Sequence, residues 1–212
     1  MQPDVNTSLL QLIDQGEGEN LEFKFEINDS RKIAETICAF ANTTGGDIIV
    51  GVKDNGSIAG VRSSEEYYMM EGAAQLYLRP AITFSSKLYS INKKEVLLVH
   101  IDEAEKKPVF CINRENQKIA YLRVADANYQ ADPVTVQMWR KIYHTKKPSL
   151  YTANEEKILH LLDEHQEAHL SRISNKSKIP YKQAIETLAQ LVVWDLIEIE
   201  YKQGKSYYKL KE

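Results

Sequence analysis

The stretch that most constrains this chain covers residues 39–60, where a polar Asn-Thr-Thr-Gly-Gly segment separates an apolar helix end from a buried strand. Apolar residues at helical spacing predict a helix over 31–42, and residues 47–52 predict the strand. The pair Gly45-Gly46 allows the chain to adopt positive φ angles between the helix and the strand. A polar bend of this kind is a candidate ligand site, and it equally fits a structural turn in which Asn42 ends the helix.

A hairpin is predicted directly after this strand. Asn55-Gly56 can supply the two positive φ angles of a type I′ turn, with residues 57–61 returning as the second strand. Helices and strands alternate through the rest of this half, and the hairpins argue against a purely parallel sheet. The sequence therefore predicts an α+β fold with these further elements: helices at 6–15, 64–78 and 134–143, strands at 21–26, 82–90, 96–101 and 119–124, and a loop at 125–132.

Charge and cysteine content limit the environment and the partners. The 212 residues carry a formal charge of −3, so contact with nucleic acid has to come from a local basic patch. Cys38 and Cys111 are too few for a disulfide framework, which favours a reducing, cytoplasmic location. No apolar run approaches the roughly 20 residues of a membrane span, and no membrane contact is expected.

A domain boundary is predicted within a polar Lys-Lys-Pro-Ser segment, which divides the chain into domains 1–147 and 148–212. The second domain begins with a helix for which Asn154 is the expected N-cap. A short helix at 170–175 and a helix at 181–193 follow, and two strands at 196–201 and 207–210 come last. Three helices followed by a hairpin predict a small winged helix-turn-helix domain.

A winged helix places the start of its third helix in the major groove and its hairpin tip on the DNA backbone. The side chains expected at these positions are Lys178, Tyr181, Lys182, Gln183, Lys202 and Lys205. Glutamine can bond adenine, and lysine can contact guanine or phosphate. Glu186 and the nearly balanced charge fit the alternative that this domain contacts protein.

Five segments of the first half resemble, in order, the Alba-like DNA-binding domain that is related to the Schlafen core. They are Leu-Glu-Phe-Lys at 21–24, Ala-Phe-Ala-Asn-Thr-Thr-Gly-Gly at 39–46, the glycine-flanked stretch 51–60, Lys-Pro at 107–108 and Tyr-Leu-Arg at 121–123. The resemblance covers about residues 8–142. It implies a mixed α/β domain of bacterial regulators, often followed by a winged helix, and an association with nucleic acid. The family's usual Arg-x-Gly ending is here Arg123-Val124-Ala125, which argues against a tight phosphate contact at this loop.

Two sets of polar residues in the first domain are candidates for binding or catalysis. Lys24, Asn42 and Arg123 are able to meet phosphate oxygens. Alternatively, Glu17, Glu22 and Asp54 would hold a divalent metal in a nuclease, since Schlafen-type nucleases are similar in carrying paired glutamates here and an acidic residue after the next strand. In a structural interpretation, Glu22, Lys24 and Glu26 share a solvated strand face and Asp54 is a turn residue.

No Gly-x-x-x-x-Gly-Lys-Ser/Thr segment is present, so nucleotide hydrolysis is not expected, although a nucleotide-binding switch stays open. The sequence thus favours a two-domain regulator of transcription that binds duplex DNA and needs no cofactor. A single winged helix with few basic groups would bind weakly, and a homodimer is therefore expected. A nucleotide or another small molecule is the candidate effector.

Overall fold

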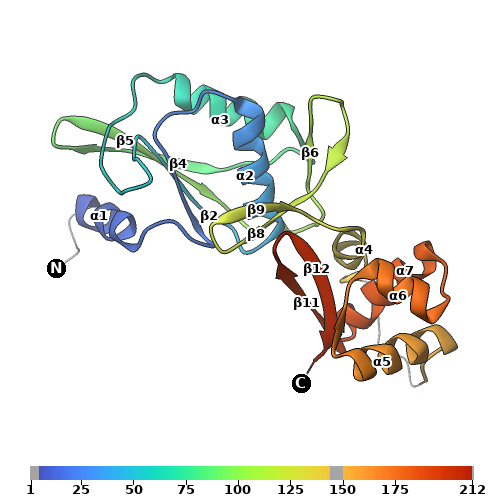
Figure 1. Cartoon of the computed structure of the whole chain (residues 1–212). Helices are drawn as coiled ribbons and strands as arrows, with labels where there is room; N and C mark the ends of the chain where they lie inside the picture. Colours follow the sequence, from blue (N-terminus) through green and yellow to red (C-terminus); the bar gives the residue numbers. More distant parts are fainter. Residues whose placement is uncertain (1–4, 144–149, 212) are drawn as a thin grey trace. The chain divides into compact units, whose positions relative to one another are not determined.

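The computed structural model describes residues 5–143 and 150–211 (Figure 1). Contacts divide the chain into two compact units, Met1–Gln130 and Ala131–Glu212. The predicted domain boundary at 147/148 lies outside the described residues. Helices and sheets are present in both units, which confirms the predicted mixture of α and β structure. Among the described residues, no helix has the length and apolar character that crossing a membrane requires.

The first unit is built on a mixed four-stranded sheet. Its strands, in spatial order, are β1 (Leu21–Lys24), β2 (Gly46–Val50), β5 (Lys94–Ile101) and β4 (Ser85–Ile91). β1 runs parallel to β2, whereas the β2–β5 and β4–β5 pairs are antiparallel. The parallel β1–β2 pair is joined by a helical crossover, as parallel neighbours require.

Both faces of the central strand β2 are buried. Helices α2 (Ser30–Asn42) and α3 (Glu65–Leu76) cover one face, where Ile48 belongs to the larger core. Helix α1 (Val5–Gln15) contributes to a smaller core on the other face, which contains Ile49. Successive strand residues point to opposite faces, so an uninterrupted apolar run fits a strand that is covered on both sides.

Two short sheets complete the first unit. One contains β3 (Leu78–Arg79), β6 (Phe110–Ile112) and β7 (Lys118–Ile119). The other pairs β8 (Tyr121–Val124) with β9 (Ala127–Gln130), which corrects the predicted loop at 125–132. Ala125 adopts a φ of 53°, so the chain reverses direction at once and Ala127 pairs with Val124.

The predicted chain reversal after β2 is present, but the hairpin is shorter than predicted and its turn is of another type. Both edges of β2 are occupied by β1 and β5, so the returning segment pairs only beyond this strand. It forms the antiparallel Val52–Ile58 bridge, and the amides of Lys53 and Ala59 donate to the carbonyls of Ser57 and Gly51. Gly56 has a φ of 78°, but Asn55 is not in the positive-φ region, so the turn is not of type I′. The Asn55 side chain instead accepts a hydrogen bond from the amide of Ser57.

The second unit combines four helices with a three-stranded antiparallel sheet of order β10-β12-β11. The elements along the chain are α4 (Pro133–Lys141), α5 (Ala153–His165), β10 (Glu167–Ala168), α6 (Leu170–Ser177), α7 (Tyr181–Val193), β11 (Ile197–Lys202) and β12 (Lys205–Leu210). Thr152, rather than the predicted Asn154, caps α5, because it forms a capping box with Glu155.

Helix α4 belongs to the second unit, although the sequence assigns it to the first domain. Its N-cap, Asp132, accepts a hydrogen bond from the hydroxyl of Tyr208 on β12. Burial raises the pKa of that tyrosine, and the nearby Asp132 charge raises it further. Thr135 lies 2.7 Å from the hydroxyl of Tyr201 on β11, and Val134 is fully buried in the core formed by α5, α6 and α7.

Candidate nucleic-acid interface

Arg123, predicted to meet phosphate, is buried in the first unit. Its Nη2 atom lies 2.6 Å from Oε2 of Glu22, and the two side chains are only 1% and 9% exposed. The guanidinium also donates to the carbonyl of Gly18, at 3.1 and 3.0 Å, and to Oδ1 of Asn128. Arg123 therefore ties β8 to the segment before β1 and offers no donor edge to a ligand. The burial of Glu22 also corrects the predicted solvated strand face.

The predicted nuclease carboxylates have separate tasks. Glu22 pairs with both Arg123 and Lys24, and Oε1 of Glu17 accepts a 2.8 Å hydrogen bond from the amide of Phe23. Asp54 is exposed in the turn after β2. Across residues 5–143 and 150–211, no three His, Cys, Asp or Glu side chains come together as a metal site would require. Lys24, a predicted phosphate contact, donates a hydrogen bond to Oε1 of Glu22.

Asn42 joins elements of the fold instead of facing a ligand. It is 1% exposed, and its amide nitrogen donates to the carbonyls of Val109 and Tyr121 at 2.8 and 2.9 Å. Its oxygen accepts from the amide of Val109 at 2.7 Å. Both ends of this side-chain amide are thus used within the protein, which corrects its predicted role as a phosphate contact.

The Asn-Thr-Thr-Gly-Gly bend is packed rather than open. Asn20 donates to the hydroxyl of Thr44 and to the carbonyl of Gly45, both at 2.8 Å. Lys107 donates to the carbonyl of Thr43. A Cβ atom at Gly45 would lie 2.7 Å from the carbonyl oxygen of Ile101. The space that a ligand would need at this bend is therefore taken by the chain itself.

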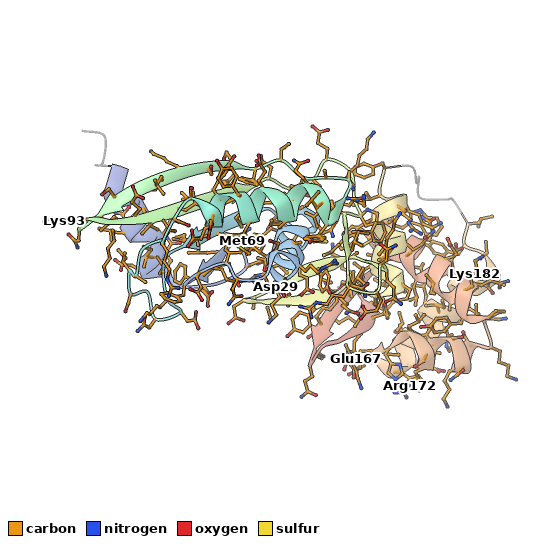
Figure 2. All side chains as sticks on the ribbon, turned by 90° about the horizontal axis from the view of Figure 1, so that it is seen from above. Asp29, Met69, Lys93, Glu167, Arg172 and Lys182 are labelled. Carbon is orange, nitrogen blue, oxygen red and sulfur yellow. The ribbon has the colours of Figure 1, made fainter. Side chains whose placement is uncertain are left out.

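In the second unit, the start of α7 presents polar side chains to solvent. Tyr181, Lys182 and Gln183 form the first turn and are all exposed. Figure 2 shows the Lys182 side chain pointing outward. Lys178, in the left-handed conformation at the end of α6, is also exposed. Within the described parts of the chain, no hydrogen bond or ion pair holds the side chains of Lys178, Lys182 or Gln183, so these remain available to a partner.

The one acidic side chain of α7 is balanced by α4. Oε2 of Glu186 lies 3.1 Å from Nζ of Lys141 and accepts a 3.0 Å hydrogen bond from Gln137. Neither partner in α4 is among the predicted site residues, because only the folded structure brings α4 beside α7. This pairing weakens the repulsion that Glu186 would exert on a phosphate backbone.

The predicted hairpin tip is tighter than expected. Gln203 and Gly204 have φ angles of 50° and 75°, so a two-residue turn joins Lys202 directly to Lys205. Nζ of Lys202 lies 2.5 Å from Glu167 and 3.2 Å from Glu200. The hydrogen bond to Glu167 is the main reason why the pKa of Lys202 is raised. Lys202 thus braces the sheet, whereas Lys205 is exposed at the tip.

No curated protein matches the chain. Among solved structures, it is similar to the DIP2311 protein from Corynebacterium diphtheriae, with 17% identity, a TM-score of 0.43, and coverage of 69% of this chain and 30% of that one. It is also similar to the N-terminal domain of a RecG-related protein from Nitrosomonas europaea, with 20% identity, a TM-score of 0.39, and coverage of 59% and 92%. At these TM-scores the likeness establishes neither fold nor function.

The family comparison concerns most of the first unit. The family model described as Schlafen, AlbA_2 matches residues 17–132, which is more than half of the chain. The matched region contains β1, α2, the packed bend and the buried Glu22–Arg123 pair. The chain belongs to the Schlafen, AlbA_2 family.

Proposed function

We propose that this protein is a DNA-binding regulator of transcription whose second unit contacts duplex DNA through α7. The observation that carries the proposal is the first turn of that helix, where Tyr181, Lys182 and Gln183 are exposed. The element order α5-β10-α6-α7-β11-β12 and the sheet order β10-β12-β11 support a winged helix. Family membership supports an association with nucleic acid.

In this proposal each exposed side chain has its own role. Gln183 bonds a base edge in the major groove, with adenine as its best partner, and Lys182 contacts guanine or phosphate. Lys178, just before the helix, and Lys205, at the tip of the β11–β12 hairpin, bind backbone phosphates, which fixes orientation without specifying sequence. Lys202, held by Glu167 and Glu200, supports the hairpin instead of contacting DNA.

Dimer formation would supply the affinity for DNA that a single second unit lacks. Two or three phosphate contacts per copy give weak binding at physiological salt. We therefore propose a homodimer in which two copies of α7 meet the half-sites of a pseudo-palindromic operator, and in which the first unit contributes to assembly or to effector sensing.

Selection of bound duplexes from a random pool tests this proposal. We expect an enriched motif, and we expect the Lys182→Ala/Gln183→Ala double variant to bind it about 10- to 100-fold more weakly by fluorescence anisotropy, because each good base contact contributes about 1–3 kcal/mol. Lys157→Ala, an exposed lysine on α5, is the matched control and should bind as the wild type does. The absence of an enriched motif, or unchanged binding by the double variant, would contradict the assignment of α7.

A further inference from the structure

A polar pocket in the first unit is lined by residues from the start of α2, the end of α3 and the β6–β7 segment. Its volume is about 370 Å³. Six of its lining residues come from sequence positions far apart: Arg31, Tyr77, Arg79, Arg114, Asn116 and Lys118. No motif connects these positions, so only the folded structure reveals the group.

The pocket concentrates positive charge in a chain whose formal charge is −3. Three arginines and one lysine line it, and none of its described lining residues is acidic. The neighbouring carboxylate of Asp29 lies 3.0 Å from Nη2 of Arg114, and its other oxygen caps α2. Asp29 therefore offsets one of the four charges, and the remainder favours an anionic ligand.

Two of the arginines are held in place by backbone carbonyl groups. Nη1 of Arg31 donates to the carbonyls of Ile112 and Asn113, at 3.3 and 2.9 Å, and its guanidinium lies 4.4 Å from the centre of the Tyr77 ring. Nη1 of Arg79 donates to the carbonyls of Leu76 and Leu78, at 3.1 and 2.7 Å. These bonds use one nitrogen of each guanidinium and reduce the entropy lost when the remaining donors bind a ligand.

Lys118 on β7 adds a fourth positive charge to the three arginines. Its side chain is exposed, and in the described parts of the chain it has no ion-pair or hydrogen-bond partner. A rigid guanidinium fork matches two oxygens of a phosphate, whereas an ammonium acts as a point charge. The combination suits a phosphate better than a single carboxylate.

We propose that this pocket binds a phosphate group, as carried by a free nucleotide or by a nucleic-acid strand. The volume lies within the range of small-ligand pockets and exceeds what one inorganic phosphate would fill. The site does not depend on the proposed role of α7, because all of its residues belong to the first unit.

The test uses the full-length chain with three probes: pyrophosphate, ATP without metal, and a single-stranded 12-mer. Isothermal titration calorimetry should detect binding that Lys118→Glu and Arg79→Ala each weaken by about tenfold or more, since each removes a charged donor. Lys106→Ala, an exposed lysine outside the pocket, is the matched control and should leave binding unchanged. Lys182→Ala/Gln183→Ala should also retain binding, which separates this site from α7.

The probes distinguish the two sources of phosphate. Binding of ATP and pyrophosphate assigns the pocket to a free nucleotide, and binding of the 12-mer alone assigns it to a strand. If no probe binds, or if the two pocket variants bind as the wild type does, the proposal is wrong. A cooperative thermal unfolding transition shows whether each variant is folded. If Lys118→Glu or Arg79→Ala is not folded, Lys118→Ala, a smaller change at an exposed position, takes its place in the test.

Discussion

At the scale of single residues, the Glu22–Arg123 pair determines what β1 can do. Both charges are removed from solvent, and Glu22 is the counter-ion of Arg123 at 2.6 Å, while it also pairs with Lys24. Breaking such a pair from one side leaves an uncompensated buried charge, which costs far more than an exposed pair contributes. A carboxylate bound in this way stabilises the fold of the family domain, and it is not free to activate water.

We expect Glu22→Gln to lower the free energy of unfolding by about 3 kcal/mol, because Arg123 would stay buried without its counter-charge. Urea denaturation followed by circular dichroism measures this loss. Lys24→Gln is the control, and because its side chain is 35% exposed it should cost less than about 1 kcal/mol. A negligible loss for Glu22→Gln, together with metal-dependent cleavage of tRNA by the wild type alone, would favour the nuclease hypothesis.

The residue types of this pair could be predicted, but their burial could not. Strict alternation in residues 21–26 predicts a polar face, and Glu22 does lie on the opposite face to Phe23. The carboxylate is covered because β8 and the segment around Gly18 close over it, with Arg123 coming from about a hundred residues further along the chain. The local alternation of polar and apolar residues carries no information about a partner so far away in the sequence.

At the scale of elements, the bend between α2 and β2 packs closely against the backbone at the end of β5. Gly45 has a φ of 74°, and a Cβ atom there would lie 2.7 Å from the carbonyl oxygen of Ile101 and 3.0 Å from the amide of Glu103. Both neighbours are backbone atoms at the end of β5, so neither can move without disturbing the sheet.

Gly45→Ala should therefore lower the free energy of unfolding by more than about 2 kcal/mol, through the combined cost of the clash and of the positive φ. Gly72→Ala in α3 is the control with the opposite expected effect, since nothing lies within 4 Å of its added Cβ atom. That substitution should stabilise the protein by about 0.5–1 kcal/mol. Equal effects of the two substitutions on thermal unfolding would show that the bend is not the packed turn described above.

A pH-dependent contact links β2 to β5 in the same sheet. Nδ1 of His100 lies 2.7 Å from Oδ1 of Asp47, and this hydrogen bond is the main cause that raises the pKa of His100 above its usual 6.5. The stabilisation is fully present below the unfolded pKa and is lost as pH rises through the folded pKa. Because the imidazole is 48% exposed, the contribution is less than about 1 kcal/mol.

We expect the difference in unfolding free energy between the wild type and His100→Gln to be largest near about pH 5.5 and to shrink towards about pH 8.5. Chemical denaturation at a series of pH values measures this difference. A difference that stays constant or grows with pH would contradict the predicted sign.

The sequence predicted most helices because their signals are local. The apolar spacing and flanking residues of 31–42 and 181–193 agree closely with α2 and α7. The length of the hairpin after β2 was not predictable in this way. The chain does turn back at the Asn55-Gly56 signal, but β1 and β5 occupy both edges of β2, so the pairing is limited to residues next to Val52 and Ile58. Tertiary pairing set the length of the hairpin here.

At the scale of the whole molecule, the proposed DNA binding requires two copies acting together. A protein that binds a pseudo-palindromic site as a dimer should have twice the 24.3 kDa chain mass in light scattering, at least when the selected duplex is added. The logarithm of its association constant for the duplex should fall linearly with the logarithm of the salt concentration. A one-to-one complex with a non-repeated site would rule out the proposed dimer.

If the first turn of α7 contacts base edges, the preference for single bases in the operator depends on Gln183. The affinity of the wild type and of Gln183→Ala is measured for the selected duplex and for each of its single-base variants. We expect Gln183→Ala to lose discrimination at one base pair per half-site, by about 1–3 kcal/mol, and to keep it elsewhere. Identical discrimination by both proteins at every position would show that Gln183 does not contact a base.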